Sequence, residues 1–480
     1  MTEVRSNSSP VADLLLTLNR DGTEPLHRQI AASIRDGIRD GRLIRDSALP
    51  ATRMLAASLD LSRGVVVEAY QQLKAEGYLA SKPGGYTVVA AGLAGAAAGT
   101  RSAAGTGARA PGMLRPAPGA APPRIDFRYG RCDPRQFPRA AWLRSVRQVL
   151  TAAPAERFGY LSGQGVPELR QALADYLNRV RGTAASPDSI VICNGFAQGI
   201  ALLFQVLAAR GAQRVAVEDP SSAGDLLVPA GLYGITLLPV PVAADGIRAE
   251  ALNEVNADAV IVTPSHQWPT GAVLGPDRRA ELLSWARRTG GLIIEDDYDA
   301  EFRYDRAPVG ALHGLAPDHV IYAGTASKTL APGLRLGWLL LPPALAGEVA
   351  EAKIDADRGS PVIDQLAFAD FLARGEFDRH LRRMRPVYRR RRDALLGALD
   401  RHLPSFCPSG ISAGFHLITW LPPSLGEEEV TAAGARAGVG VYGVAPYRTL
   451  AGPPALLFGY AGLSEQAIGE GIRLLAGAIS

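Results

Sequence analysis

The chain has 480 residues, and its 51 lysine and arginine side chains against 47 aspartate and glutamate side chains give a net charge of +4. At about 150 residues per domain, this length allows about three folding units. Apolar residues make up 47% and charged residues 20% of the chain, which is typical of a globular protein and excludes a disordered one. The near balance of charge excludes a protein held on nucleic acid by bulk charge alone, although it leaves room for a local basic face.

Cysteine usage and hydropathy predict the compartment. Cys132, Cys193 and Cys407 form no CxxC pair and no even disulfide framework, which favours a reducing compartment. Residues 1–10 are polar and lack the apolar core of a signal peptide. The longest apolar runs, such as 336–341, are far shorter than the about 20 residues that a membrane span needs. We therefore expect a soluble, cytoplasmic protein.

A stretch without regular hydrophobic periodicity divides the chain. Residues 91–124 are rich in Gly, Ala and Pro and contain no acidic residue. This composition predicts a flexible linker, and a structureless length of more than about 30 residues argues against the alternative of a surface loop inside one domain. We therefore predict a small domain at 20–90 and a larger one at 125–480.

The small domain is predicted to contain three helices and a hairpin. A first helix lies between Pro25 and Gly41, with one apolar face formed by Leu26, Ile30, Ile34 and Ile38. A second follows in the segment LPATRMLAASLD, and a third starts at Ser62, which can cap it, and ends at Gly77. Two strand-like runs then flank the turn KPGG. This order is typical of a winged helix-turn-helix (α+β) domain, in which the third helix enters the DNA major groove by its polar N-terminal end.

The segments PLHRQIAASIRDGIRDGRL, LPATR and LSRGVVVEAYQQLKAEGYLAS resemble the GntR family of bacterial winged-helix regulators. The resemblance implies contacts with double-stranded operator DNA, and the residues that it places there are Arg53, Ser62, Arg63, Lys82 and Gly84. The chain departs from the family after Arg63, where Gly64 and three valines replace the usual polar side chains, so fewer donors remain for base edges. The alternative is that Arg53 and Arg63 are ordinary solvated charges.

The larger domain alternates strand-like with helical segments. Its strand-like runs lie at 189–193, 214–219, 258–264, 291–298 and 319–324, and amphipathic segments such as 278–289 separate most of them. Strands that are apolar on both faces and separated by helices predict a largely parallel α/β sheet. Ligands of such sheets bind at the carboxyl ends of the strands. The chemically distinctive residues of this domain follow those ends.

Two of these segments carry groups that suit a phosphorylated pyridine ring. Residues 194–198 present backbone N–H groups at the start of a helix and suit a phosphate, although a plain strand-to-helix turn is an equal alternative. In IIEDDYDAEF, Asp296 and Tyr298 share a strand face, so a carboxylate can keep a pyridinium nitrogen protonated while a phenol hydrogen-bonds the ring oxygen. An acidic metal cluster is the competing interpretation, but it would normally gather histidines or further carboxylates, and none are adjacent.

The scarcity of lysine draws attention to one more segment. Only four of the 51 basic residues are lysines, namely Lys74, Lys82, Lys328 and Lys353. Imine chemistry needs an amine that can lose its proton, which lysine supplies and arginine does not. Lys328 stands in TASKTLAPGLRLGW, where Arg335 supplies a planar fork for a phosphate. Thr325 and Ser327 add hydroxyl groups, while a surface position is the alternative for any single lysine.

The larger domain resembles the fold-type I aminotransferase domain of MocR/GabR-type (PdxR-like) regulators in YLSGQGVPELRQALADYLNRVRG, VEDP, VTPSHQWPTG, IIEDDYDAEFRY and IYAGTASKTLAPGLRLGW. The resemblance implies an α/β domain that binds pyridoxal 5'-phosphate (PLP), a smaller C-terminal α+β subdomain and a head-to-tail homodimer. It implies Lys328 as the Schiff-base lysine, Asp296 as the partner of the pyridine nitrogen and Tyr298 as the ring-oxygen contact. The phosphate ligands that it implies are Gly195, Phe196, Ala197, Gln198, Thr325, Ser327, Arg335 and, from the neighbouring subunit, Tyr160.

The chain departs from this family at positions that hold a ring or a substrate. Ser221 and Ser222 follow VEDP, where members often have an aromatic residue that stacks on the pyridine ring. Leu457 occupies the position expected for the arginine that binds a substrate carboxylate, a contact that orients the substrate in transamination. Arg448 is close enough in sequence to replace it. His266 is a single histidine, which is more often a buried hydrogen-bonded residue than a catalyst.

Residues 377–392, FDRHLRRMRPVYRRRR, form a strongly basic segment. It has the length and charge to follow DNA or to lie at a subunit junction. We expect instead a helix face exposed to water, because runs of like charge are usually solvated.

These features predict a PLP-dependent transcriptional regulator that is cytoplasmic and associated with the nucleoid, not an enzyme. The expected effector is PLP or an amino compound joined to it, which changes the placement of paired headpieces on DNA and controls vitamin B6 or amino-acid metabolism genes. The missing carboxylate arginine favours PLP itself, with residual transamination at most. A catalytically active aminotransferase with an accessory DNA-binding headpiece is the alternative, and a PLP-independent DNA-binding scaffold is a third interpretation.

Overall fold

The structure is a computed structural model of the chain. It describes residues 18–20, 24–39, 42–44, 46–82, 86–90, 122–304, 309–410 and 412–479. Most of the predicted linker, at 91–121, and the predicted DNA contact Gly84 lie outside the described residues. None of the helices within the described ranges is both long and apolar enough to cross a lipid bilayer.

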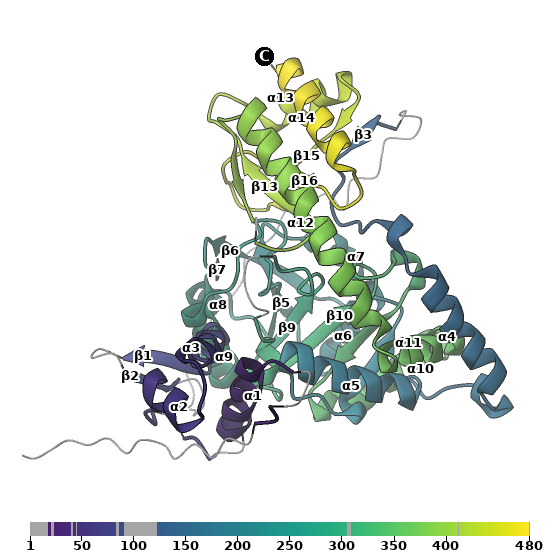
Figure 1. The fold of residues 1–480 in the computed structure, drawn as a ribbon. Coiled ribbons are helices and arrows are strands. Elements are labelled where there is room, and N and C mark those ends of the chain that lie inside the picture. The colour runs from purple at the N-terminus through teal and green to yellow at the C-terminus, as the bar shows by residue number, and fades with distance from the viewer. Residues whose placement is uncertain are drawn as a thin grey trace, which may run out of the picture.

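The N-terminal part of the chain, called the headpiece below, folds as the predicted winged helix (Figure 1). Its elements are α1 (Leu26–Arg39), α2 (Thr52–Ser58), α3 (Arg63–Ala75), β1 (Leu79–Lys82) and β2 (Tyr86–Val89). Apolar side chains three and four residues apart bury a common core, which includes Ile30, Ile34, Val66, Tyr70 and Leu73. The strands pair antiparallel, with Leu79 opposite Val89. Ser62 stands at the N-cap of α3, but its side chain makes no capping hydrogen bond.

An eight-stranded sheet forms the centre of the larger domain. In spatial order its strands are β4 (Ile190–Cys193), β11 (Gly337–Leu340), β10 (Val320–Thr325), β9 (Leu292–Asp297), β8 (Ala259–Val262), β5 (Arg214–Asp219), β6 (Thr236–Ala243) and β7 (Gly246–Ile247). The strands from β10 to β6 are mutually parallel, while β11 runs antiparallel between β10 and β4. The largely parallel sheet is thus confirmed, with all five predicted strands in place.

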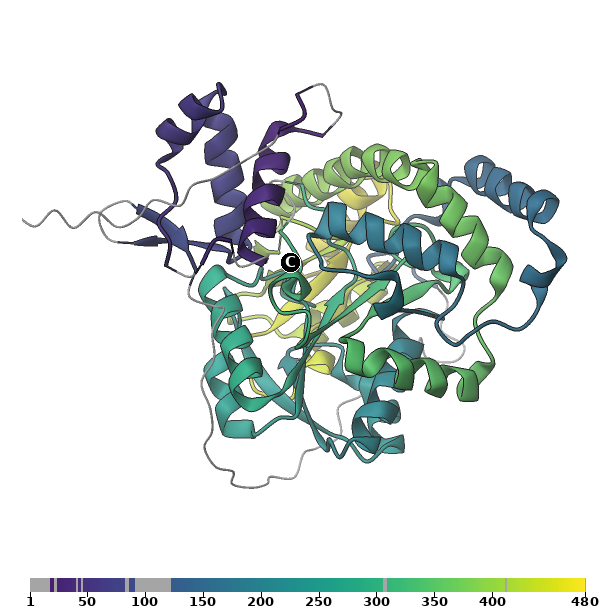
Figure 2. The ribbon, with the colours of Figure 1, turned by 90° about the horizontal axis from the view of Figure 1, so that it is seen from below.

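Helices cover both faces of this sheet (Figures 1 and 2). Alternate residues of a strand point to opposite faces, so Ile190 and Ile192 pack in one apolar cluster while Val191 and Cys193 pack in another. The helices on the first face are α4 (Arg139–Ala152), α5 (Pro167–Arg181), α8 (Leu252–Val255), α9 (Pro276–Thr289) and α11 (Val362–Ala373). Those on the second are α6 (Phe196–Ala209), α7 (Ala223–Leu232) and α10 (Pro343–Asp357). Burial on both faces explains why the central strands are almost continuously apolar.

The long helix α12 (Glu376–His402) leads to a smaller C-terminal subdomain (Figure 1). Its four-stranded sheet has the order β12 (Cys407–Ser409), β13 (His416–Trp420), β16 (Ala455–Gly459) and β15 (Tyr442–Gly443), and its helices are α13 (Glu427–Arg436) and α14 (Glu465–Ile479). The strand β3 (Ile125–Asp126) pairs in parallel with β14 (Val439–Gly440). This pairing ties the start of the larger domain to the subdomain, which has the predicted α+β composition.

The basic segment 377–392 lies in α12, and the expectation that it is a solvated face is wrong for part of it. Arg391 and Arg392 are buried. The guanidinium of Arg391 donates to the carboxylate of Asp133 at 3.0 Å and lies over the ring of Tyr388. The charge pattern could not reveal this pair, because Asp133 lies 258 residues away in the sequence.

We expect Leu73→Ala to destabilise the headpiece. The side chain is fully buried, and truncating such a leucine costs about 2–5 kcal/mol through lost burial and the cavity that remains. Because a chain of several domains need not unfold in one step, the measurement is hydrogen exchange of the α1 and α3 amides, which should accelerate. Met54→Ala, at a side chain that is 67% exposed, should leave these rates unchanged. Equal rates in the two variants would contradict the core position of Leu73.

Candidate functional site

The residues predicted for the cofactor meet at one edge of the large sheet. Asp296 lies near the end of β9, Tyr298 follows that strand, and Lys328 follows β10. The turn into α6 reaches the same edge because Cys193, at the end of β4, pairs with Gly337 at the start of β11. Parallel strands bring their carboxyl ends together in this way.

The amine of Lys328 points into the protein. Its Nζ donates to the backbone carbonyl of Gly130 at 2.5 Å. Gly130 has φ +70°, which favours glycine, and a Cβ there would lie 3.4 Å from the amine. Burial lowers the pKa of Lys328, and the charge of Asp296 opposes that shift. An amine that is partly removed from water loses its proton readily, and the unprotonated amine is the form that attacks an aldehyde.

Asp296 differs from the acidic groups beside it, because its carboxylate accepts no hydrogen bond from another described side chain or amide. Burial raises the pKa of Asp296 to about 8, with a further rise from Asp297 and an opposing effect of Lys328. Asp297, in contrast, accepts from Arg181 at 2.7 Å and from Tyr322 at 2.6 Å. A buried carboxylate without a partner needs a cationic donor to stay ionised, and a protonated ring nitrogen is such a donor. The surroundings of Asp296 therefore fit the pyridine nitrogen of PLP.

A small pocket adjoins Asp296. Its walls include Phe196, Ser221, Ser222, Thr263 and Trp268. The two serines leave room where related chains often carry an aromatic residue, while Phe196 and Trp268 supply aromatic surface from other directions. Sequence reasoning did not select Trp268 as a site residue. The only sequence signal for it was its place in the segment VTPSHQWPTG.

The turn into α6 has the geometry of an anion site. Gly195 stands at the N-cap with φ +81°. Phe196 and Ala197 form the first turn, where backbone N–H groups have no partner within the helix. The guanidinium of Arg335 packs so closely on Gly195 that an added Cβ would lie 3.0 Å from it. Backbone donors and a guanidinium therefore converge at one place, as a phosphate requires.

Three other predicted phosphate ligands are engaged with protein groups. Thr325 Oγ1 lies 3.0 Å from Ser327 Oγ. The side-chain amide of Gln198 donates to Asp357 at 2.6 Å, and its oxygen accepts from Lys353 at 3.1 Å. Lys353 is fully buried and pairs with Asp357 at 2.6 Å. Lys353, one of the four lysines, thus belongs to an internal ion pair. The role of Gln198 in binding the phosphate stays a prediction.

Tyr298 belongs to a buried polar cluster that sequence reasoning missed. Its hydroxyl donates to the backbone carbonyl of His266 at 2.9 Å. Nδ1 of His266 lies 3.0 Å from that hydroxyl and 2.8 Å from Asp299. Burial raises the pKa of Tyr298 well above its usual value, with further contributions from Asp299 and Asp296. The phenol therefore keeps its proton at neutral pH and acts as a donor.

The fold also brings together two histidines that are far apart in the sequence. His266, Asp299 and His416 offer ligand atoms within 4.8 Å of one another. Hydrogen bonds already occupy these groups, because Nε2 of His416 lies 3.2 Å from the carbonyl of Pro269 and Nε2 of His266 lies 3.4 Å from that of Gly410. Burial also lowers the pKa of His416 well below its usual value, so the ring is neutral. Hydrogen bonding accounts for the cluster without an ion.

The region expected to bind a substrate carboxylate is apolar or already engaged. Leu457 is fully buried in β16 and packs with Tyr447. Arg448 lies over the ring of Trp420 and donates to the carbonyl of Pro453. Its guanidinium is therefore held in place by protein groups. Arg448 therefore does not take the place of the carboxylate-binding arginine that is absent at position 457.

Two residues beside the site were not predicted. Tyr129 packs against Trp268 with ring centroids 4.8 Å apart, directly before the glycine that receives the lysine amine. Arg128 donates to the hydroxyl of Tyr442 at 3.0 Å and lies 3.4 Å from the carboxylate of Asp126. This segment lies about 200 residues before Lys328, so no local pattern connects the two.

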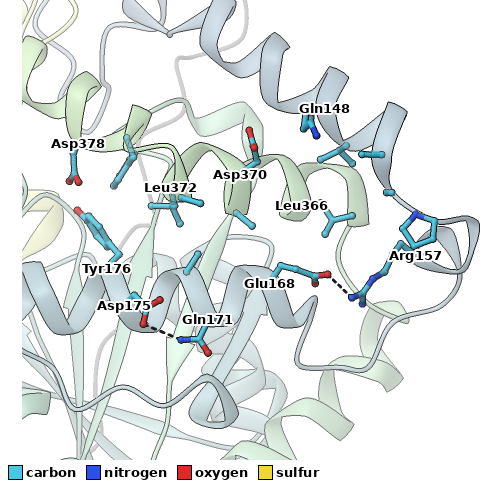
Figure 3. Close-up of a pocket in the computed structure, with 18 of the residues that line it drawn as sticks. Gln148, Arg157, Glu168, Gln171, Asp175, Tyr176, Leu366, Asp370, Leu372 and Asp378 are labelled. Carbon is cyan, nitrogen blue, oxygen red and sulfur yellow. Dashed lines mark hydrogen bonds and ion pairs between the residues drawn. The ribbon is translucent and has the colours of Figure 1, made fainter.

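A larger pocket of about 680 Å³ lies away from this site, between α4, α5 and α11 (Figure 3). Its walls carry Tyr176, the ion pair of Arg157 with Glu168 at 2.5 Å and the hydrogen bond of Gln171 with Asp175. None of the described residues predicted for the cofactor lines it.

Tyr160, the residue predicted to reach the partner subunit, lies on the surface of the chain. Its side chain is 95% exposed. An aromatic side chain of this size is rarely so open to water in a finished assembly. Its predicted place at the phosphate of a neighbouring subunit stays a prediction.

The headpiece presents its predicted DNA contacts to solvent. Arg53, Ser62 and Arg63 are exposed at the starts of α2 and α3. Nε of Arg63 lies 3.5 Å from Thr52 Oγ1, a long contact that leaves the guanidinium available. Lys82, at the end of β1, pairs with Asp46 at 2.7 Å, and both side chains are about half exposed. Exposed ion pairs contribute little, so DNA can compete for this lysine.

Two family models match the chain. Residues 26–89 match the bacterial regulatory proteins of the gntR family. Residues 130–474, more than half of the chain, match the aminotransferases of class I and II.

Two relatives match along most of the chain, and a solved structure matches about three quarters of it. The chain is 33% identical over 476 residues to the probable rhizopine catabolism regulatory protein MocR of Rhizobium meliloti, covering 97% of this chain and 96% of the relative. It is 32% identical over 418 residues to the HTH-type pyridoxine biosynthesis transcriptional regulator PdxR of Corynebacterium glutamicum, covering 85% and 86%. The crystal structure of LysN, an α-aminoadipate aminotransferase from Thermus thermophilus, matches with a TM-score of 0.66 at 27% identity, over 74% of this chain and 92% of that one. The chain therefore belongs to the HTH-type transcriptional regulators in which a GntR-family winged helix is joined to an aminotransferase class I and II domain.

Proposed function

We propose that this regulator binds PLP at Lys328 and that the bound cofactor changes how its headpieces are placed on operator DNA. The observation that carries the proposal is that an inward-pointing amine shares the site with Asp296, a partly buried carboxylate that accepts no hydrogen bond from the described residues. PLP supplies an aldehyde for the amine and a basic ring nitrogen for the carboxylate. These two groups on one ring match the inward-pointing amine and the carboxylate of Asp296, which accepts no hydrogen bond from the described residues.

The chain's own residues would hold PLP at four places. Lys328, whose pKa burial lowers, would take the aldehyde carbon. Asp296 would hold the proton at the ring nitrogen, and Tyr298 would donate to the ring oxygen in place of its present acceptor, the His266 carbonyl. The N–H groups at the start of α6 and the guanidinium of Arg335 would bind the phosphate. Thr325, Ser327 and Gln198 would reach it by exchanging their present partners.

Pairing of two chains would complete the regulator. We propose a head-to-tail homodimer in which the exposed Tyr160 reaches the phosphate of the neighbouring copy. Two linked headpieces raise each other's effective concentration at neighbouring half-sites. A ligand changes DNA binding only by favouring one arrangement of the pair over another. The proposed regulator acts in the cytoplasm, on the DNA that it binds.

We propose PLP itself as the effector. Leu457 offers no charge to a substrate carboxylate, and Arg448 is held by Trp420 and the Pro453 carbonyl. The relative PdxR is named for pyridoxine biosynthesis, which supports vitamin B6 genes as targets. An amino compound joined to PLP is the second candidate, with genes of amino-compound metabolism as targets, since MocR is named for rhizopine catabolism.

The competing function is transamination. One observation favours it, namely 29% identity over 74% of the chain to a 2-aminoadipate transaminase of Thermus thermophilus. Multiple turnovers of an amino acid with a keto acid, at a rate that depends on Lys328, would establish this function. The absence of an arginine at position 457 argues against it, because bidentate binding of the carboxylate orients the substrate for reaction.

We expect the purified protein with PLP to be yellow and Lys328→Ala to be colourless once free PLP is removed, because the amine of Lys328 forms the imine that retains the cofactor and absorbs visible light. Lys74→Ala removes another lysine, on the headpiece, and is the matched control that should stay yellow. The measurement is the visible absorbance after removal of free PLP. A yellow Lys328→Ala protein, or a colourless parent protein, would refute the assignment.

The function itself is tested by DNA footprinting upstream of neighbouring genes. We expect the protected region to change when PLP is added to the cofactor-free protein, because the cofactor favours one placement of the headpieces. Lys328→Ala should give one footprint, whether or not PLP is present. A parent footprint that does not respond to PLP would leave the scaffold interpretation.

We expect Arg63→Ala to weaken operator binding and to reduce the slope of log affinity against log salt by about 1, because one phosphate or base contact is lost. Arg436→Ala removes an equally exposed arginine from α13 and should change neither quantity. Binding is measured by titration of labelled operator DNA at several salt concentrations. Equal affinities for the two variants would remove Arg63 from the DNA surface.

A further inference from the structure

The headpiece is docked on the larger domain. Figures 1 and 2 show the headpiece against the larger domain. The apolar core of the headpiece continues without a break into the cluster that contains Leu283, Leu312 and Leu315. The hydroxyl of Tyr78 donates to the backbone carbonyl of Gly314 at 2.8 Å in a buried position. The receiving surface is therefore the segment 309–316 together with α9.

A buried ion pair of the headpiece fits between two turns of the larger domain. Arg35 and Glu76 are bonded through both guanidinium and carboxylate atoms, with a shortest distance of 2.7 Å. A Cβ at Gly310 would lie 3.0 Å from the carboxyl carbon of Glu76, and one at Gly182 would lie 3.3 Å from Nε of Arg35. A side chain at either position would press on the ion pair, so glycine suits this close approach.

Docking leaves the DNA contacts free. The headpiece residues at the interface, Glu76 to Tyr78, follow the C-terminal end of α3. Arg63 begins the same helix at its other end and is exposed. The docked headpiece can therefore bind DNA, and docking fixes where its DNA-reading end is held.

Buried charged side chains hold residues 309–316, called the docking segment below, in place. The guanidinium of Arg181 donates to the carbonyl of Val309 at 2.7 Å and to Ser265 Oγ at 2.8 Å, and its Nε donates to Asp297 at 2.7 Å. Glu295 accepts the backbone N–H groups of residues 312 and 313 at 3.0 and 3.1 Å. Both acids belong to β9. One strand thus positions the surface that receives the headpiece.

The same strand carries the cofactor's proposed partner on its other face. Side chains alternate along a strand, so Asp296 faces the pocket while Glu295 and Asp297 face the docking segment. Adjacent buried carboxylates repel each other, and Asp297 raises the pKa of Asp296. Without a cation in the pocket, Asp296 holds a proton at neutral pH, because its pKa is raised to about 8. A protonated ring nitrogen at Asp296 lets this carboxyl group ionise, and the new negative charge lies one residue from Asp297, the partner of Arg181.

We propose that the segment 309–316 is an interaction surface for the headpiece whose strength depends on the cofactor site, with Arg181 as the positioning residue between them. This inference rests on the proposed binding of PLP. PLP at Asp296 stabilises the bonds of Arg181 to Asp297 and Val309, and these hold Gly310 and Gly314 in the geometry that receives Glu76 and Tyr78. The cofactor thereby favours the docked headpiece.

Two variants of the full-length protein test the coupling. Tyr78→Phe removes the hydroxyl that reaches Gly314 and keeps the ring, and Gly310→Ala places a methyl group against Glu76. Coupling between binding events is reciprocal, so weaker docking means weaker PLP binding. We expect the dissociation constant for PLP, followed by its colour, to rise about three- to tenfold in each. Tyr86→Phe is the matched control, since Tyr86 lies in the same hairpin but is 66% exposed; its affinity should equal that of the parent.

Hydrogen exchange supplies a readout that does not depend on colour. In the parent protein, PLP should slow exchange of the amides of Leu312, His313 and β1, and this protection should be smaller in Tyr78→Phe. The coupling is overturned if both interface variants keep the parent affinity, or if PLP leaves exchange at these amides unchanged. Failure of the parent protein to bind PLP would instead refute the proposed function, so the two failures are distinct.

Discussion

Four carboxylates lie within five residues at the end of β9. The arrangement of the groups around them depends on which donor each carboxylate binds. They are Glu295, Asp296, Asp297 and Asp299. An unpaired buried carboxylate costs several kcal/mol, so each must find donors or hold a proton. Asp297 takes Arg181 and Tyr322, Asp299 takes His266, and Glu295 takes two backbone N–H groups. Only Asp296 is left without a donor among the described residues, and it faces the pocket. A group with a protonated ring nitrogen completes the set.

The same constraint joins the two functions of the chain. A strand in the middle of a covered sheet has two faces, and β9 uses one for the proposed cofactor contact and the other to hold residues 309–316. The headpiece rests on that segment through Tyr78 and the ion pair of Arg35 with Glu76. Because a packed interior transmits small shifts, a change of charge at Asp296 is felt at the docking surface through one residue step along the backbone. A sensor built this way needs no separate signalling element.

Contiguous features of this structure could be predicted from the sequence, and features that join distant segments could not. The five strands, the headpiece helices and the grouping of Asp296 with Lys328 follow from local periodicity and from short motifs at strand ends. The pair of Lys353 with Gln198 spans 155 residues, and the bond from Tyr78 to Gly314 spans 236. Hydrophobic periodicity indicates that a residue is buried, but it does not identify the residues that pack against it. For the same reason the basic run in α12 was expected in water, although Arg391 is buried on Asp133.

The distribution of retained and missing groups separates sensing from turnover. Catalysis requires interactions that are stronger in the transition state than with bound substrate, and correct orientation supplies much of that difference. The chain keeps groups that suit binding of PLP, but at the carboxylate position it has Leu457, buried among apolar neighbours. A sensor requires only that its ligand bind one arrangement of the protein more tightly than another. The amine of Lys328, the unpartnered Asp296 and the cradle at Gly195 meet that lesser requirement, and the proposed role as a sensor needs no residue at position 457 that binds a substrate carboxylate.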